Sequence, residues 1–188
     1  MSEVAVVSIA RTPCGRAHKG TLRDTRPDTL AGITIRESLA RTKPLDPHAL
    51  GDVIIGCAMP EGEQGMNVGR NIALMAGLPV TVPGMTVNRF CSSGLEAISL
   101  ASLRVMAGWS EVTIGGGVES MTYVPMPGHM PRPNPEYTKI HADLYASMGI
   151  TAAFDAGAID TREPGMSLMQ ALADATGLDV LALPAGQG

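Results

Sequence analysis

Residues 87–96 read VNRFCSSGLE and join two kinds of predicted structure. They continue an apolar run typical of a strand and lead into residues whose apolar spacing is typical of a helix. Cys91 therefore lies where we expect the strand to end and the helix to begin. Backbone N–H groups in the first turn of a helix are unpaired and the helix dipole is positive there, which favours a thiolate and can stabilise an oxyanion.

Four apolar runs are predicted as strands, and three helical patterns separate them. The strands are expected at residues 4–10, 53–59, 85–90 and 112–114, and the helices at 29–42, 67–76 and 92–107. A helix-breaking residue follows each helix, namely Lys43 with Pro44, Gly77 and Gly108. The strand runs are almost continuously apolar, so we expect a largely parallel or mixed sheet covered on both faces. The order βαβαβαβ predicts an α/β domain with functional loops at the carboxyl ends of its strands.

The last predicted strand is followed by Gly115, Gly116 and Gly117, a run that lets the backbone approach a ligand or another backbone closely. The run lacks the spacing of a dinucleotide fingerprint, and no phosphate-binding loop motif follows any strand. Beyond residue 117, five prolines between Pro125 and Pro135 predict loop rather than core, and a weak helical run follows at 166–176.

Composition excludes several classes of protein. The chain has 188 residues, 45% of them hydrophobic, and a net charge of −4 with no basic block, so we expect no nucleic-acid partner. The first residues do not show the basic segment followed by a long apolar segment that is typical of a signal peptide. No apolar stretch is long enough to cross a bilayer. We therefore expect a soluble, cytoplasmic protein without membrane partners. The three cysteines form no Cys-x-x-Cys pair, so we expect free thiols and no metal site.

Two roles remain open for Cys91 from local chemistry alone. Ser92, Ser93 and Gly94 are small enough to let a substrate carbonyl reach the Cys91 sulfur, as a nucleophile on a rigid, buried helix requires. The alternative is a buried small hydrophobe, the usual role of a cytosolic cysteine, to which we assign Cys14 and Cys57. Cysteine nucleophiles normally need a histidine base, but a structural role is expected for each of the four histidines, His18, His48, His129 and His141.

One side of the helix predicted at 92–107 is suited to close packing against another helix. Leu95, Ile98 and Val105 recur at helical spacing, with the small Ser102 among them.

Five motifs, in the same order as in the thiolase family, make the sequence resemble a thiolase from about residue 4 to 152. They are Arg11 to Pro13 with Gly15, then residues 62–67 (GEQGMN), 87–94 (VNRFCSSG), 115–121 (GGGVESM) and 148–152 (MGITA). The resemblance implies a layered αβαβα fold made of two similar halves. This chain would carry the N-terminal half, with an α/β half-domain at 1–117, the start of a loop domain that covers coenzyme A at 118–152, and a divergent tail at 153–188.

The resemblance also implies the chemistry. The Cys91 thiolate would attack the keto carbon of a 3-ketoacyl-CoA, acetyl-CoA would leave, and a second CoA thiol would take the acyl group; the reverse is condensation. The GEQG sequence resembles the degradative 3-ketoacyl-CoA thiolases (acetyl-CoA C-acyltransferases) of fatty-acid β-oxidation more closely than the thiolases that condense two acetyl-CoA molecules. CoA would act as co-substrate with no bound cofactor or metal, the complete enzyme would be a dimer or tetramer, and Met148 would line the acyl pocket, although ordinary core packing explains that methionine equally well.

Two family motifs are absent from the sequence, the Gly-His-Pro histidine and a second cysteine in Cys-x-Gly, which supply the acid and base. After Ala152 the family's Glu-Asn is replaced by Ala153 and Phe154, and we expect a truncated or frameshifted end. An alternative is therefore a non-catalytic fragment that pairs with intact thiolase subunits. A ketoacyl-synthase-like condensing enzyme would share the architecture, but the sequence of residues 88–94 is a poor match to that class of enzyme.

Overall fold

The computed structural model describes residues 3–43, 45–126, 128–129, 152–155 and 179–182. Two units make up the chain, Met1–Gly128 and His129–Gly188. The second unit is described only as a pair of parallel strands, β4 (Ala152–Asp155) and β5 (Asp179–Ala182). Met148, His141 and the helical run expected at 166–176 lie outside the described residues.

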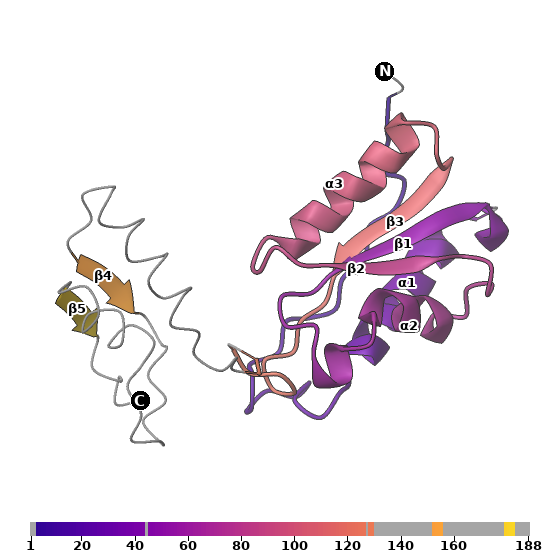
Figure 1. Cartoon of the computed structure of the whole chain (residues 1–188). Coiled ribbons are helices and arrows are strands. Elements are labelled where there is room, and N and C mark those ends of the chain that lie inside the picture. Colours follow the sequence, from indigo (N-terminus) through magenta and orange to yellow (C-terminus); the bar gives the residue numbers. More distant parts are fainter. Residues whose placement is uncertain (1–2, 44, 127, 130–151, 156–178, 183–188) are drawn as a thin grey trace. The chain divides into compact units, whose positions relative to one another are not determined.

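The first unit is built on a parallel sheet of three strands in the order β2-β1-β3 (Figure 1), and these strands overlap three of the four predicted apolar runs. The strands are β1 (Leu50–Gly56), β2 (Gly84–Val87) and β3 (Val112–Gly117). β1 is central, pairs with both neighbours, and is buried along nearly its whole length. A continuously apolar run fits that position because helices cover both faces of the strand.

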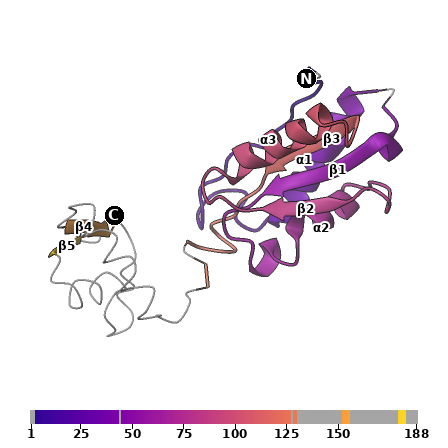
Figure 2. The same cartoon turned by 45° about the horizontal axis from the view of Figure 1, so that its top comes forward.

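Helices cover both faces of this sheet (Figure 2). α3 (Ser93–Met106) packs on one face against β1 and β3, while α1 (Pro27–Arg41) and α2 (Val68–Met75) lie together on the other, where α2 contacts β1 and β2. The larger core forms between β1 and the α1–α2 face, and a smaller one under α3 around Ile54, Ala97 and Ala101. Short 3₁₀ turns, Pro47–Ala49 and Gly62–Gln64, precede β1 and α2.

The predicted breakers do end two of the helices. Gly77 and Gly108 each follow a helix with positive φ, +82° and +73°, the left-handed conformation that terminates a helix and that glycine adopts without a steric penalty.

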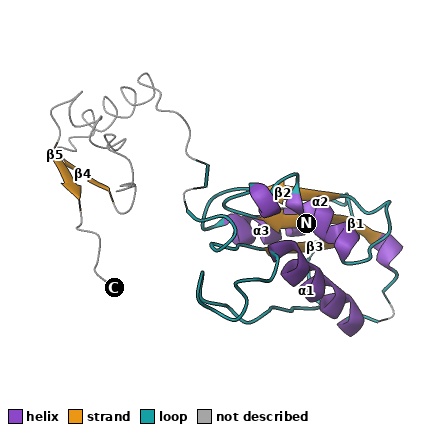
Figure 3. Cartoon of the chain, turned by 90° about the horizontal axis from the view of Figure 1, so that it is seen from below, coloured by secondary structure: helices purple, strands orange, loops and turns teal. Residues whose placement is uncertain are grey.

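The strand predicted at 4–10 is wrong, so the observed order begins with α1. The strands in Figure 3, drawn in orange, are β1 to β5 and do not include these residues. Val6, Val7 and Ile9 are each about three-quarters exposed, at 76%, 73% and 75%. A strand needs a neighbour for its N–H and C=O groups, and residues 3–10 form no backbone–backbone hydrogen bond within the described part of the chain.

The glycine run forms the end of β3, although the sequence predicted that the strand would stop at residue 114. A Cβ on Gly115 would lie 2.8 Å from the Ile98 Cα, and one on Gly117 would lie 3.1 Å from the Gly94 Cα. On β1, a Cβ on Gly56 would lie 2.2 Å from the Ser93 carbonyl. The prediction that the run permits close backbone approach is confirmed, because α3 lies against these glycines.

Candidate active site

Three loops leave the sheet side by side at its carboxyl edge, as we expected for the functional loops. Gly56 is in register with Val87 of β2 and with Gly117 of β3. The Cys57 N–H donates to the Val87 carbonyl at 3.0 Å and the Val118 N–H to the Gly56 carbonyl at 3.0 Å, which extends the pairing past the strands. The segments that begin at Cys57, Asn88 and Val118 are therefore neighbours, and the second of them carries Cys91.

Cys91 lies two residues before α3 begins at Ser93 and is exposed. The expectation of a cysteine at the start of a helix is confirmed, but the helix is not buried as a whole. Only Ser93, Ala97 and Ala101 of α3 are buried, while Leu95 is 69% and Ile98 47% exposed. Its outer side is uncovered in the described residues because the elements that contact it, β1, β2 and β3, all lie on its inner side.

The turn that carries Cys91 is fixed by hydrogen bonds on both sides of the cysteine. The Asn88 side chain accepts from the Phe90 N–H at 2.8 Å and donates to the Ala58 carbonyl at 3.0 Å. Ser93 Oγ accepts from the Arg89 N–H at 2.9 Å and donates to the Phe90 carbonyl. Between them Phe90 adopts φ of +48°, a conformation uncommon for a bulky residue, which is retained because its surroundings hold it.

The N–H groups of the first turn of α3 differ in their hydrogen bonding. The Ser92 and Ser93 N–H groups already donate to the Arg89 and Phe90 carbonyls, at 3.1 and 3.0 Å. Those of Gly94 and Leu95 have no acceptor among the residues that the structure describes. Fewer N–H groups at the helix start therefore lack an acceptor than the sequence suggested.

The other two cysteines have different surroundings. Cys57 is 1% exposed, as expected for a structural cysteine. Burial first, and then the nearby Glu119 carboxylate, raises the pKa of the Cys57 thiol to about 12, so it stays protonated at neutral pH. Cys14 is exposed, so the expectation that it is buried was wrong: it lies in a loop, where no element covers it.

The hydrogen bonds of His18 and His48 do not bring either residue to Cys91. The His18 N–H donates to Thr122 Oγ1 at 2.9 Å, and the His48 N–H to Asp46 Oδ1 at 2.9 Å, so both backbones belong to turns elsewhere. His129 has polar contacts of its own. Within the described residues no cluster of three or more His, Cys, Asp or Glu side chains is arranged to hold a metal ion.

Glu119 and Gln64 are connected to the Cys91 turn through Ala58 and Asn88, and they were missed as site residues. They join the loop after β3 to the 3₁₀ turn that precedes α2. Both fall inside motifs quoted above, residues 115–121 and 62–67, but no spacing in the sequence indicates that they contact each other.

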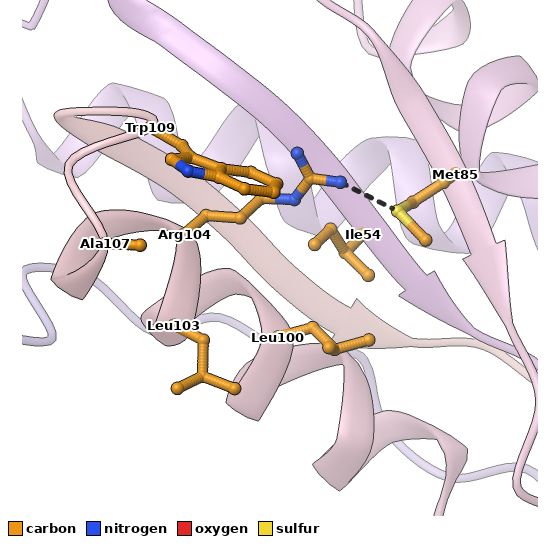
Figure 4. Close-up of a pocket in the computed structure, with 7 residues that line it drawn as sticks. All are labelled: Ile54, Met85, Leu100, Leu103, Arg104, Ala107 and Trp109. Atoms are coloured by element: carbon orange, nitrogen blue, oxygen red, sulfur yellow. Dashed lines mark hydrogen bonds between the residues drawn. The ribbon is translucent and has the colours of Figure 1, made fainter.

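A mainly apolar hollow lies over the carboxyl-terminal half of α3 (Figure 4). Arg104 crosses it, 5.7 Å from the centre of the Trp109 ring and 3.5 Å from the Met85 sulfur. The guanidinium also pairs with Asp52 at 3.2 Å, and the Asp52 side chain is only 5% exposed. Because a buried carboxylate needs a partner, Arg104 has a structural role here.

The first unit is an α/β layered domain with an exposed cysteine at the start of a helix, at the carboxyl edge of a parallel sheet, which is an arrangement suited to a cysteine nucleophile. The family model for the thiolase N-terminal domain matches residues 4–161. The chain therefore belongs to the thiolase family.

Curated relatives agree with this assignment over 152 residues, 81% of the chain. A 3-ketoacyl-CoA thiolase of Bacillus subtilis is 50% identical, one of Saccharophagus degradans 46% and one of Colwellia psychrerythraea 41%. The chain covers 39% of the length of each of these relatives. No helix in the described part of the chain combines the length and the apolar character needed to span a membrane.

Proposed function

We propose that Cys91 is the acyl-accepting nucleophile of a thiolase and that this chain carries the nucleophile half of the reaction. The observation that carries the proposal is the placement of Cys91, exposed at the carboxyl edge of the sheet and two residues before α3. An exposed position at the start of a helix is typical of nucleophilic cysteines. Relatives named 3-ketoacyl-CoA thiolase support a 3-ketoacyl-CoA as substrate and CoA as co-substrate.

In the proposed reaction, the Cys91 thiolate adds to the C3 keto carbon of a 3-ketoacyl-CoA, and the keto oxygen takes the negative charge. The N–H groups of Gly94 and Leu95 are the donors available for that oxyanion. When the carbonyl reforms, the bond between C2 and C3 breaks, and acetyl-CoA leaves as an enolate that must be protonated. The acyl group stays on Cys91 until a second CoA thiol, giving up its proton, attacks and releases acyl-CoA.

Carbon–carbon cleavage also requires an acid that protonates the leaving enolate. The family draws this group from a histidine and a second cysteine, in motifs absent from this sequence. Loss of a general acid or base typically costs ~10²–10⁴-fold in rate. We therefore propose that the chain alone accepts an acyl group slowly but shows little thiolytic turnover. The closed acyl pocket with Met148, the β-oxidation role, the oligomeric state, the cytoplasmic location and the domain boundaries remain predictions.

The test is intact-mass measurement after incubation with acetyl-CoA. The wild-type chain should gain one acetyl group, Cys14→Ala should gain it equally, and Cys91→Ala should not. An adduct that persists in Cys91→Ala would assign the nucleophile elsewhere. A parallel incubation with acetoacetyl-CoA and CoA measures cleavage as a loss of the thioester absorbance. Rapid cleavage would contradict the proposal that this chain alone accepts an acyl group but shows little thiolytic turnover.

A non-catalytic module that pairs with intact thiolase subunits is the second candidate. The exposed apolar side chains Leu95, Ile98 and Leu103 on α3 favour it, since such a surface suits a protein partner. Absence of any acyl adduct on Cys91, together with co-purification with an intact thiolase, would select this function.

A further inference from the structure

We propose that Glu119 and Gln64 are positioning residues, which hold the Cys91 turn in its working conformation through Ala58 and Asn88. The inference rests on the proposed role of Cys91 and concerns residues that do not themselves contact that cysteine. A chain of hydrogen bonds connects them to it across the three loops at the carboxyl edge of the sheet.

Glu119 is the centre of this network. One carboxylate oxygen accepts from the Ala58 N–H at 2.6 Å, and the other accepts from the Gln64 amide at 2.7 Å and from the Met59 N–H at 3.4 Å. Hydrogen bonds to a charged acceptor are about twice as strong as neutral ones. The carboxylate therefore ties the loop after β1 to the loop after β3.

Gln64 secures the other side of the network. Its side chain is fully buried, its amide nitrogen also donates to the Met59 carbonyl at 2.8 Å, and its amide oxygen accepts from the Ser120 N–H. A buried amide with these partners satisfied is rigid, because every alternative orientation would leave a polar group unpaired.

The network reaches Cys91 through one side chain. The Ala58 N–H is held by Glu119 and the Ala58 carbonyl accepts from Asn88 at 3.0 Å, while Asn88 in turn accepts the Phe90 N–H at 2.8 Å. Phe90 is the residue with φ of +48°, directly before Cys91. If Ala58 shifts, Asn88 loses its anchor and the strained turn relaxes, which moves the sulfur and the N–H donors behind it.

A small displacement matters for acyl transfer more than for simple alkylation. Acyl transfer needs the sulfur and the oxyanion donors aligned with one carbonyl, and a misplacement of about 1 Å can cost ~10²-fold in rate. Iodoacetamide needs only access to the thiolate. A positioning role therefore predicts that the two reactions of Cys91 separate when the network is cut.

The experiment uses the full chain and compares Glu119→Ala, Asn88→Ala and the double variant with wild type. We expect Glu119→Ala to slow acetylation of Cys91 by acetyl-CoA at least ~10-fold, while its reaction with iodoacetamide changes less than ~3-fold. Because Glu119 acts through Asn88, the double variant should be no slower than Asn88→Ala alone. Glu119→Gln, which keeps an acceptor oxygen, should recover part of the loss, and the exposed Glu111→Gln is the matched control.

Amide hydrogen exchange tests whether Glu119 holds the Cys91 turn, and it does so without any acyl transfer. The Phe90 amide should exchange at least ~10-fold faster in Glu119→Ala, with Ala97 and Ala101 in α3 unchanged. If the wild-type chain takes no acyl group, the proposed function fails and the exchange result alone decides the inference. The inference would be overturned by an unchanged exchange rate of the Phe90 amide. It would also be overturned if the double variant were slower in acetylation than Asn88→Ala by the same factor by which Glu119→Ala is slower than wild type. Should Glu119→Ala unfold, revealed by alkylation of Cys57, Glu119→Gln and Asn88→Ala give the answer.

Discussion

Cys57 and Cys91 follow neighbouring strands of one sheet, yet their surroundings give them opposite chemistry. Cys57 is covered by the core and lies 3.8 Å from a Glu119 oxygen, so its thiol stays protonated. Cys91 is exposed at the positive end of α3. Position relative to the sheet edge separates a structural cysteine from a candidate nucleophile.

Limited alkylation at neutral pH should therefore modify the cysteines in a fixed order. Cys91 should react first, because it is exposed at the start of α3 and its small neighbours Ser92 and Gly94 leave room for the reagent. Cys14 should follow, since it is exposed but has no such helix, and Cys57 should remain unmodified until the chain unfolds. Peptide mapping after short exposure to iodoacetamide checks the order. Modification of Cys14 or Cys57 ahead of Cys91 in folded protein would contradict the assignment of the nucleophile.

Alkaline pH should destabilise the fold through Cys57. Its thiol has a pKa of about 12 in the folded chain against an ordinary value of 9.0, so the unfolded chain loses its proton first as pH rises. This contribution to the free energy of unfolding is fully present below pH 9 and is lost between pH 9 and about 12, by at most about 1.4 kcal/mol per pH unit. Urea unfolding between pH 8 and 10.5 measures it. Cys57→Ser cannot titrate, so an equal slope in that variant would show that other groups are responsible.

At the scale of single residues, the candidate active site could be predicted only in part from the sequence. Cys91 was identified because a strand-to-helix junction is visible in the local pattern. Asn88, Gln64 and Glu119 come from three separate segments that meet only when β1, β2 and β3 are in register, so their hydrogen bonds depend on tertiary structure.

At the scale of elements, local periodicity predicted most of the fold. α1, α2 and α3 begin and end within about two residues of their predicted limits, because amphipathic spacing and breakers are local signals. The failure at residues 4–10 has a different origin. A strand depends on a neighbouring backbone, and in the described residues no backbone–backbone hydrogen bond joins this segment to another. β3 runs longer than predicted because close contact with α3 overrides the low strand propensity of glycine.

Gly56→Ala should destabilise the first unit strongly. The added Cβ would lie 2.2 Å from the Ser93 carbonyl, which is backbone and cannot rotate away, so α3 must shift. Overpacking of this kind costs about 1–3 kcal/mol. Urea unfolding of wild type and variant gives the difference.

Gly116→Ala is the matched control for that substitution. A Cβ on Gly116 would meet no atom within 4 Å, so the free energy of unfolding should change by less than about 1 kcal/mol. Equal stability for the Gly56 and Gly116 variants would contradict the close contact between α3 and the sheet.

At the scale of the whole molecule, the exposed side of α3 should make the chain associate. Leu95 is 69% exposed and Ile98 47%, and contiguous apolar surface in water promotes association. Light scattering should report species larger than a monomer, and a hydrophobic dye should bind. Leu95→Lys should reduce both signals. Met66→Lys, at a site 91% exposed away from α3, should leave them nearly unchanged. A monodisperse monomer without dye binding would contradict the expectation.

Close spacing between α3 and the sheet also affects how genetic variants of such a chain are interpreted. Substitutions at Gly56 and Gly115 would lower activity, as those at Cys91 do, although neither glycine carries a functional group. A screen that scores activity alone would therefore assign them to the catalytic machinery. Their signature is a loss of protein abundance, whereas a change at Cys91 leaves the protein present but inert, so abundance measured beside activity distinguishes damage to the spacing from damage to the chemistry.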